Sequence, residues 1–565
     1  MSEESHPNQA AEVATEDGSE NAIADESKTP RFRWELGLAI VILGIFAELF
    51  VVNRYSEGRD IRFGGTYQVF FSVYVVLPST ILLLGIWWLL LSGLRWSTRL
   101  IGTAVAVVLV GSLLAMFRFE GFEGDMIPRW TWRLESSGDE RLQEFLTNLS
   151  SASNGNGADT ANETDVASPP SNQPLNVNDG DWPNFRGTNW DSTTNQTKLS
   201  RDWPSSPPEL VWKHPSGVGW SSFAVVDGLV FTQEQRKEDE VTVCYDLNTG
   251  NQIWSHEEEI RFIESLGGDG PRSTPTVYDS RIYTLGATGI LQCLEARTGE
   301  RVWSADILED ADALNLQWAM AGSPLIVNDW VIVNPGGIEG SSIAAYHRLT
   351  GKKVWSSGDS AASYSTAQIA DIAGTQTIVI YDGDGVTGYA LADGKKLWAF
   401  PWTNQPKINA AMPFIDGNKI LAGTGYATGS IRFEVRNDGD EWVTTTLWKS
   451  RFMRPKFNDF LVKDGFVFGL DEGIMACIDL ETGKRQWKRG RYGYGQLLLS
   501  NDLIIVLSDK GELVLLETNS KQHKELGQIE AVEGKTWAHP ALVRDLILIK
   551  SELETACYRL PLAEH

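Results

Sequence analysis

The sequence has few of the residues that build disulfide frameworks, metal sites and the commonest catalytic centres. It contains four cysteines and seven histidines in 565 residues, and no two cysteines are adjacent. Four cysteines are too few for a small disulfide-stapled framework, and the histidines show no metal-ligand spacing. The G-x-S-x-G, Walker and H-E-x-x-H motifs are also absent. We therefore predict no metal site and assign no catalytic residue.

Basic residues are outnumbered, with 49 Lys and Arg against 74 Asp and Glu and a net charge of -25. Nucleic-acid phosphates require a Lys/Arg surface, so we predict no nucleic-acid partner. Residues 1–30 are acidic and lack an apolar pattern, which predicts a disordered tail. No basic segment precedes a cleavage site near the start, so we expect no removed signal peptide.

Long apolar runs are confined to residues 34–117. They cover about 34–53, 67–94 and 100–117, and each is close to the ~20 residues that span a bilayer as a helix. The sequence therefore predicts three transmembrane helices, with the membrane as a partner. Lys and Arg are nearly balanced on the two sides of these runs, so charge alone does not decide the orientation.

The chain changes composition twice after the apolar runs. Residues 134–180 are rich in Ser, Asn, Gly and Thr, which predicts a flexible low-complexity linker. From residue 181 to 565 the sequence is turn-rich, and the whole chain has 22 Trp and 53 Gly. This composition favours an all-β domain.

A short phrase repeats through the second half of the chain. CYDLNTGNQIW, residues 244–254, returns as CLEARTGERVW from Cys293 and as CIDLETGKRQW from Cys477. In each copy a Gly stands four residues before a Trp, as in Gly250 with Trp254, Gly299 with Trp303, Gly351 with Trp355, Gly394 with Trp398 and Gly483 with Trp487. We expect the Gly to turn a hairpin with φ > 0 and the Trp to dock one unit on its neighbour.

The spacing of the repeat indicates a β-propeller. The last residue of the phrase, or its equivalent, falls at 212, 254, 303, 355, 398, 448, 487 and 523, and periods near 40–50 residues with strand-like units are typical of propeller blades. The final unit supplies only three strands, and Glu209 to Lys213, with Trp212, can complete it. Such closure removes the open sheet edge and gives eight blades. Seven blades is the alternative, if the irregular copy at Trp448 belongs to an enlarged neighbour.

The repeat resembles the tryptophan-docking motif of a known superfamily. Cys244, Asp246, Thr249, Gly250 and Trp254 match Ala-x-Asp-x-x-Thr-Gly-x-x-x-Trp of the pyrroloquinoline-quinone (PQQ) repeat propellers, with Cys in the Ala place. That superfamily includes quinoprotein dehydrogenases and non-enzymatic BamB-like members. The segment DWPNFRGTNWDS, residues 181–192, resembles the membrane-anchored PQQ-like propellers common in planctomycete bacteria. The resemblance implies a bacterial inner-membrane protein with its propeller on the periplasmic side.

The resemblance also implies a test for a cofactor. In quinoprotein dehydrogenases PQQ stacks between a Trp and a disulfide of adjacent cysteines, beside a Ca²⁺ ion and an Asp base. Here Cys244, Cys293, Cys477 and Cys557 occupy the Ala place of separate units. We expect them to be small buried side chains of inner strands. No cofactor is therefore predicted, and PQQ with calcium, in a PQQ-dependent dehydrogenase, is the alternative.

The connections between units supply a candidate binding face. The two long connections, 255–271 and 304–322, are expected to bring Arg272 and Trp318 to the rim of the central channel. Equivalent segments add Lys407, Asn409, Arg454, Lys456, Asn458, Tyr494 and His539. Such a set suits an anionic small molecule or a peptide, and solvated rim residues are the alternative. The predicted function is a membrane-anchored, non-catalytic scaffold that binds proteins or peptides, in envelope biogenesis.

Overall fold

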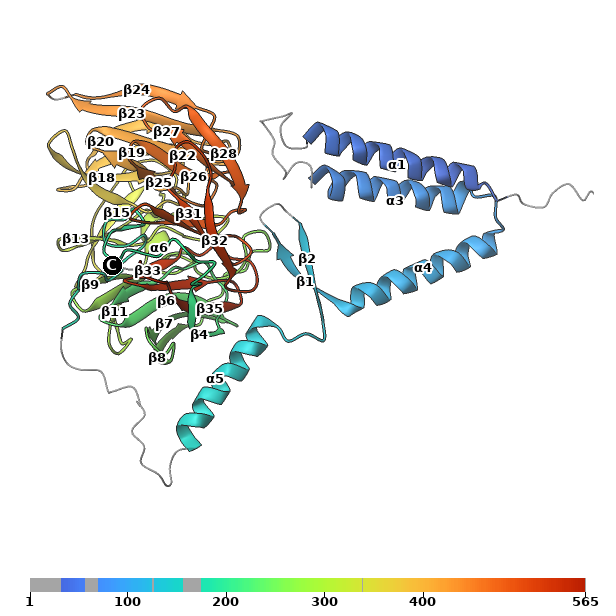
Figure 1. The fold of residues 1–565 in the computed structure, drawn as a ribbon, viewed down its shortest axis with the longest axis horizontal. Coiled ribbons are helices and arrows are strands. Elements are labelled where there is room, and N and C mark those ends of the chain that lie inside the picture. The colour runs from blue at the N-terminus through green and yellow to red at the C-terminus, as the bar shows by residue number, and fades with distance from the viewer. Residues whose placement is uncertain are drawn as a thin grey trace, which may run out of the picture. The chain divides into compact units, whose positions relative to one another are not determined.

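The computed structural model describes residues 32–55, 70–123, 127–155, 174–337, 339–439 and 441–563. Within these ranges the chain separates into a helical unit and a larger unit, which comprises the sheets and the segments packed on them (Figure 1). The predicted acidic tail, residues 1–30, lies outside the described residues. Each unit is built from the pattern that its own residues carry.

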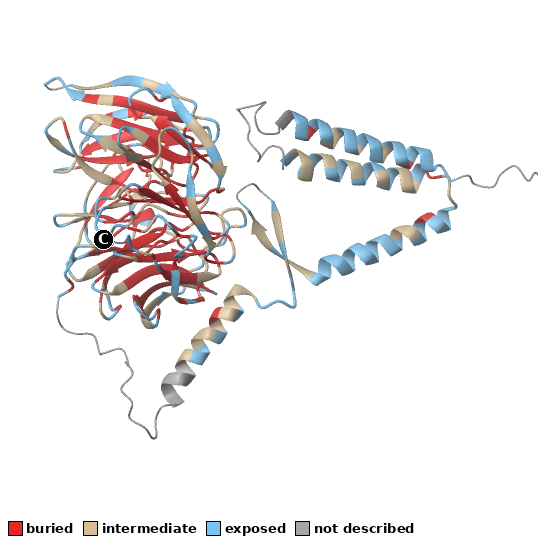
Figure 2. Ribbon diagram, in the orientation of Figure 1, coloured by how far each residue is buried: buried red, intermediate tan, exposed pale blue. Residues whose placement is uncertain are grey.

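Three long apolar helices precede the sheet region, as predicted. The first is α1 (Trp34–Tyr55), the second is formed in turn by η1 (Phe71–Val76), α3 (Leu77–Ile86) and η2 (Trp87–Leu91), and the third is α4 (Trp96–Met116). Most of their side chains are exposed, as Figure 2 shows. Their apolar stretches of 20, 21 and 21 residues are long enough to cross a membrane.

Eight sheets, numbered here as blades 1 to 8, confirm the predicted eight-bladed ring in the described chain. Blade 1 comprises β5 (Ala224–Val226), β6 (Leu229–Arg236), β7 (Asp239–Asp246) and β8 (Gln252–Glu258), and blade 2 comprises β9 (Thr276–Tyr278), β10 (Arg281–Leu285), β11 (Ile290–Glu295) and β12 (Arg301–Asp306), with helix α6 (Ile307–Ala311) after it. Blade 3 comprises β13 (Leu325–Val327), β14 (Trp330–Val333), β15 (Ile343–His347) and β16 (Lys353–Ser357), and blade 4 comprises β17 (Gln368–Ile372), β18 (Thr375–Tyr381), β19 (Gly385–Ala390) and β20 (Lys396–Pro401).

The second half of the ring follows the same order. Blade 5 comprises β21 (Phe414–Asp416), β22 (Lys419–Thr424), β23 (Gly429–Asn437) and β24 (Trp442–Ser450), and blade 6 comprises β25 (Phe460–Lys463), β26 (Phe466–Asp471), β27 (Ile474–Asp479) and β28 (Arg485–Arg491). Blade 7 comprises β29 (Gln496–Ser500), β30 (Leu503–Leu507), β31 (Glu512–Glu517) and β32 (Glu525–Glu530), extended by β3 (Thr193–Thr194). First strands of neighbouring blades contact one another between β33 and β5, β5 and β9, β9 and β13, and β25 and β29, which places these strands innermost in the ring.

Blade 8 closes the ring with strands from both ends of the sheet region. It comprises β33 (Ala541–Val543), β34 (Leu546–Lys550) and β35 (Glu554–Arg559), and its fourth strand is β4 (Glu209–Pro215). β4 pairs antiparallel with β35 and places Trp212 opposite Cys557. The predicted closure is therefore the one that forms.

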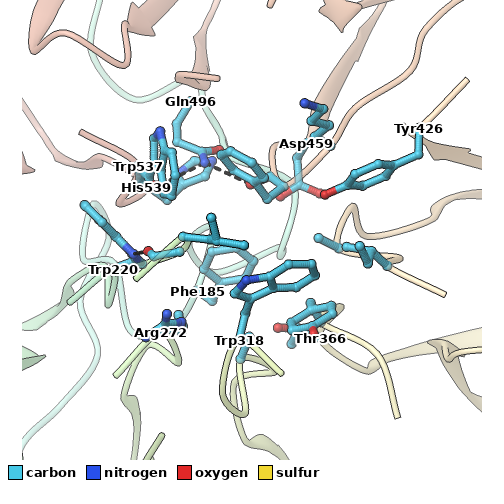
Figure 3. Close-up of a pocket in the computed structure, with 18 of the residues that line it drawn as sticks. Phe185, Trp220, Arg272, Trp318, Thr366, Tyr426, Asp459, Gln496, Trp537 and His539 are labelled. Carbon is cyan, nitrogen blue, oxygen red and sulfur yellow. Dashed lines mark hydrogen bonds between the residues drawn. The ribbon is translucent and has the colours of Figure 1, made fainter. Parts of the chain in front are cut away.

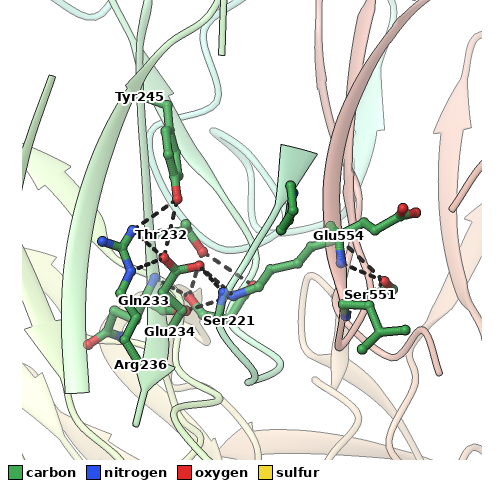
Figure 4. Close-up of polar contacts among 12 residues, drawn as sticks. Ser221, Thr232, Gln233, Glu234, Arg236, Tyr245, Ser551 and Glu554 are labelled. Carbon is green, nitrogen blue, oxygen red and sulfur yellow. Dashed lines mark hydrogen bonds and ion pairs between the residues drawn. The ribbon is translucent and has the colours of Figure 1, made fainter. Parts of the chain in front are cut away.

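Buried charges join blade 8 to blade 1 at this seam (Figure 4). Lys550 Nζ donates to the carbonyl of Gln233 at 3.0 Å and lies 3.9 Å from the Glu234 carboxylate. Glu234 also accepts from Arg236 Nε at 2.7 Å and from the amide of Gly217 at 2.9 Å. Lys550 and Glu234 are fully buried, so the seam depends on charges that water does not reach.

The Trp of one blade packs on the Gly turn of the next. A Cβ on Gly250 would lie 2.5 Å from the Trp212 ring, and one on Gly299 would lie 2.5 Å from the Trp254 ring. The same contact pairs Trp303 with Gly351, Trp355 with Gly394 and Trp448 with Gly483, and these five glycines have φ between 65° and 73°. Side chains other than Gly are disfavoured there by both the backbone and the ring. Trp398 instead packs over Gly388 of its own blade, and the Trp487 indole donates to the Asn519 carbonyl at 2.8 Å.

The four cysteines are free and buried, but their strands differ from the prediction. They lie on the third strands β7, β11, β27 and β35, not on the inner strands. Each pairs directly with a docking Trp of the fourth strand, as Cys244 does with Trp254. A small side chain leaves room there for the indole beside it.

Part of the predicted linker 134–180 is a helix, which corrects that prediction for α5 (Gly138–Gly155). Ser137 and Glu140 form a capping box, in which the Glu140 amide donates to Ser137 Oγ and the Ser137 amide donates to Glu140 Oε2. Leu142 is buried and Phe145 stacks on His214 of β4, with ring centroids 5.0 Å apart. Before α5, β1 (Phe117–Phe122) and β2 (Pro128–Trp132) form a two-stranded hairpin.

Candidate functional site

A chamber of about 410 Å³ opens at one end of the channel (Figure 3). Seven of the eight connections between blades contribute residues to its wall. At the eighth connection the lining residue is Gln496, the first residue of β29. In seven blades, the residue four places before the inner strand lines the chamber. These residues are Trp220, Arg272, Ala321, Tyr364, Ala410, Lys456 and Trp537. A repeated backbone position therefore builds a wall of mixed side chains.

The segment 181–194 crosses the channel below the chamber. Trp182 exchanges backbone hydrogen bonds with Val225 of β5, and the Val277 amide of β9 donates to the Pro183 carbonyl at 2.8 Å. At the other end the Leu499 amide of β29 donates to the Ser192 carbonyl at 2.9 Å. The segment thus bonds to inner strands of blades 1, 2 and 7. It brings Phe185 to the chamber wall.

A buried polar cluster lies under the wall. Arg186 contacts Asp459 at 3.3 Å and donates through Nε to Ser192 Oγ at 2.8 Å. Ser192 Oγ lies 3.1 Å from His539 Nε2, and His539 Nδ1 lies 3.0 Å from the Pro540 carbonyl. Burial, assisted by the charge of Arg186, lowers the pKa of His539 to about 3, so the imidazole is neutral.

Ser192 and His539 are as close as the nucleophile and base of a catalytic pair. Unlike such a nucleophile, however, the Ser192 hydroxyl is not accessible to a substrate. Ser192 is fully buried, and Arg186 directs a charged donor at its hydroxyl oxygen. A serine in this position cannot reach a substrate in the chamber. The cluster instead fixes the segment 181–194 to the ring, and burial raises the pKa of Asp459 despite the nearby Arg186.

Cationic side chains lie against aromatic rings at the chamber. Lys535 Nζ is 4.3 Å from the ring centre of Trp537 and 5.1 Å from that of Trp220. Lys456 Nζ is 4.1 Å from the ring centre of Tyr494 and donates to its hydroxyl at 2.7 Å. Ring faces attract such cations. Burial lowers the pKa of Lys535 to about 8 and that of Arg272 to about 10, so both groups are poorly hydrated.

The tip of the β1–β2 hairpin also reaches the chamber. Phe122 and Glu123 belong to its lining. Lys535 Nζ donates to the Phe122 carbonyl at 3.2 Å, and Arg129 of β2 forms an ion pair with Glu552. Residues more than 400 positions apart in the sequence thus hold the hairpin at the rim.

Four of the nine predicted face residues line the chamber, namely Arg272, Trp318, Lys456 and His539. The other five are engaged elsewhere. Lys407 pairs with Asp384 at 2.6 Å, Asn409 Nδ2 donates to the Asp382 carbonyl at 2.8 Å, Arg454 pairs with Asp471 at 2.7 Å, Asn458 Oδ1 accepts from the Lys456 amide at 3.0 Å, and Tyr494 packs behind Lys456.

Several lining residues were not predicted, and one signal marks the position of some of them. Trp220, Tyr364 and Trp537 occupy the position four places before an inner strand, as Arg272 and Lys456 do. Aligning the connections on the strand starts would have found them. Phe122 and Tyr426 carry no such signal, because a hairpin remote in sequence and a blade hairpin supply them.

The chamber does not fit a calcium-bound quinone. Its carboxylates are Glu123 and Asp459, and Asp459 is already bound by Arg186 and by the Met412 amide at 2.6 Å. Across the described residues no three His, Cys, Asp or Glu side chains gather to hold a metal. The cysteines lie in four different blades and form no disulfide. The donors that the quinoprotein pattern requires are therefore not brought together.

The closed ring of Trp-docked blades defines a PQQ-repeat β-propeller. A family profile described as "Outer membrane protein assembly factor BamB" matches residues 206–319 and 237–489, which together cover half of the sequence. The chain belongs to this family.

Individual relatives include both BamB proteins and dehydrogenases. BamB of Moranella endobia is 23% identical over 344 residues, which are 56% of this chain and 82% of that protein. Quinohemoprotein alcohol dehydrogenase ADH-IIG of Pseudomonas putida is 28% identical over 23% of this chain, and the match spans 18% of that enzyme's length. The crystal structure of BamB from Moraxella catarrhalis superposes with a TM-score of 0.47 at 15% identity, covering 63% of this chain and 99% of that one.

Proposed function

We propose that this chain is a membrane-anchored scaffold on the periplasmic side of a bacterial inner membrane, whose propeller binds a segment of a partner protein without catalysis. The observation that carries the proposal is the chamber, because connections from around the ring converge on one aromatic and cationic hollow. Loops on a rigid scaffold are common binding sites. The relatives named as outer membrane assembly factors support an extracytoplasmic role in envelope biogenesis.

The state of the chamber's polar groups favours binding over chemistry. His539 is neutral and buried, Ser192 is inaccessible, and Asp459 is neutralised by Arg186. Arg272 and Lys456 of the lining, and Lys535 against the lining ring of Trp537, are donors that suit acceptors on a ligand. These donors and the surrounding rings have the composition of a peptide-recognition pocket.

A photo-crosslinking amino acid at Trp318 of the full chain, in cells that natively make it, tests this function. We expect an adduct with one extracytoplasmic protein, because Trp318 lies in the chamber wall. Leu314 is the matched control, since it belongs to the same connection but is 93% exposed and outside the lining. Mass spectrometry identifies the adducts. Equal adducts at the two positions, or none at Trp318, would contradict the proposal.

A further inference from the structure

The chamber already contains a piece of polypeptide, and that piece has a distinct chemistry. The hairpin tip that enters it reads Phe122–Glu123, an aromatic residue followed by a carboxylate, and Phe119–Glu120 repeats the pair just before. We propose that the chamber recognises an aromatic side chain next to a carboxylate in a partner polypeptide, and that the hairpin tip occupies it as the chain's own substitute for that ligand. The inference rests on the proposed function, because it names the ligand of the same site.

The aromatic half of the ligand matches the wall. Trp220, Trp318 and Trp537 line the hollow (Figure 3), and the half-buried Phe122 belongs to the same lining. Trp220 and Trp537 lie 5.1 Å apart between ring centres, and Phe457 lies 4.6 Å from Trp537. Aromatic rings at such separations gain energy beyond their buried area. A ligand ring would therefore extend a cluster that the connections have already formed.

The carboxylate half matches the donors. Lys535 and Arg272 lie at the chamber with few acceptors of their own. Among the described residues Lys535 Nζ donates to the Phe122 carbonyl of the hairpin, and Arg272 donates to the carbonyls of Gly268 and Gly270. The Trp537 indole N–H is buried and has no acceptor among the described residues. A carboxylate would supply the acceptor for which these groups are placed.

The hairpin is held loosely enough to exchange. Among the described residues its polar contacts with the ring are the Lys535–Phe122 bond and the Arg129–Glu552 ion pair. Three of its other four aromatic residues, Phe119, Trp130 and Trp132, stay 42–48% exposed. A two-stranded hairpin is only marginally stable by itself. A partner segment with the same chemistry can therefore compete with it for the chamber.

Binding of a fluorescent peptide to the full chain in nanodiscs tests the inference. The peptide copies residues 117–123, and its matched control carries Gln for both Glu. Phe122→Ser removes the tip from the chamber, and Arg129→Gln unfastens the hairpin without altering the chamber. If the tip fills the chamber nine-tenths of the time, either variant should bind about tenfold tighter than the unchanged chain. Leu134→Ser, at a 93% exposed position beyond the hairpin, should leave affinity unchanged.

The outcomes separate this inference from the proposed function. Lys535→Met in the Phe122→Ser background should weaken the Glu peptide about tenfold and leave the Gln peptide nearly unaffected, since one charge-assisted contact is lost. Equal binding of both peptides, or no gain in either hairpin variant, would overturn the ligand class. Crosslinking at Trp318 would still support the scaffold in that case. In the last arm PQQ is added as a competitor, with and without Ca²⁺. Displacement of the peptide by PQQ without Ca²⁺ would indicate that the ligand is a small aromatic acid and not a peptide, which would overturn the inference.

The peptide should also bind less tightly as pH rises. Burial places the pKa of Lys535 near 8, where Glu552 and Glu264 oppose and Arg129 and Arg272 reinforce that effect. Above this pKa the amine is neutral, so affinity should fall about tenfold between pH 7 and pH 9. A bound carboxylate raises the pKa of the amine in the complex, so the fall begins near the pKa of the free chain and ends near that of the complex. The same titration of the Lys535→Met variant should be flat, and an equal fall there would assign the effect to another group.

Discussion

Replacing Glu234 with Ala should lower the free energy of unfolding of the propeller by about 3–5 kcal/mol, the usual cost of breaking a buried charge pair. The substitution leaves Arg236 without its principal partner, at 2.7 Å, and removes the acceptor of the Gly217 amide. Lys550 loses the carboxylate that lies 3.9 Å from its Nζ. Chemical unfolding followed by tryptophan fluorescence measures the loss.

Glu238→Ala is the matched control for this prediction. Glu238 lies in the turn after β6, its side chain is 74% exposed, and it pairs with Arg261 at 2.9 Å. Exposed pairs contribute at most about 1 kcal/mol, so this variant should unfold nearly as the unchanged chain does. Similar losses at Glu234 and Glu238 would show that the seam does not depend on its buried charges.

The two partners at the seam titrate in different ways. Burial opposes the charge of Glu234, but Arg236 and Lys550 outweigh it and the pKa of Glu234 is lowered. Burial lowers the pKa of Lys550 to about 8, against the attraction of Glu234. Arg236 lies closer to Glu234 than Lys550 does, so it supplies most of the pairing. Since the folded pKa of Lys550 is below its unfolded value, this amine makes stability rise as pH increases from about 8 to about 10.5.

The ring was predictable because its signal is local. Thr-Gly turns and Trp residues recur within each blade, and a final unit of three strands required one more, which β4 supplies. The strand of the cysteines was misassigned although the phrase contains the answer. Cys244 stands just before the turn that leads to Trp254, so it belongs to the third strand, not to the inner one. The prediction was wrong because a small residue at this place of the motif suggested the inner strands, which crowd around the channel.

The chamber was harder to predict because its parts are non-local. Segment 181–194 carries no strand pattern, and its place in the channel depends on partners such as Leu499 and His539. Helix α5 was missed because the Ser- and Asn-rich composition of its segment predicted a linker. The capping box of Ser137 and Glu140 was nevertheless present in the sequence. The hairpin tip is joined to the rim by Lys535 and Glu552, a pairing that no single-sequence pattern expresses.

The contact between Trp212 and Gly250 allows the docking energy to be separated from backbone strain. Gly250 and Gly228 both lie in turns of blade 1, with φ of 71° and 77°. A Cβ on Gly250 would lie 2.5 Å from the Trp212 ring, whereas one on Gly228 would meet nothing within 4 Å. Changing either to Ala adds the same left-handed strain of about 1–2 kcal/mol, but only Gly250→Ala also forces Trp212 to move.

Gly250→Ala should therefore lower the free energy of unfolding by about 2–5 kcal/mol, the strain plus an overpacking cost of about 1–3 kcal/mol. Gly228→Ala should lose only the strain, and the difference between the two measures the Trp212 contact. Displacing Trp212 also disturbs its indole bond to the Leu247 carbonyl, at 2.8 Å. Because Trp212 belongs to blade 8 and Gly250 to blade 1, that difference measures docking across the closing seam. Equal losses in chemical unfolding would mean that the indole adapts freely and that its contact with Gly250 adds nothing to docking at the seam.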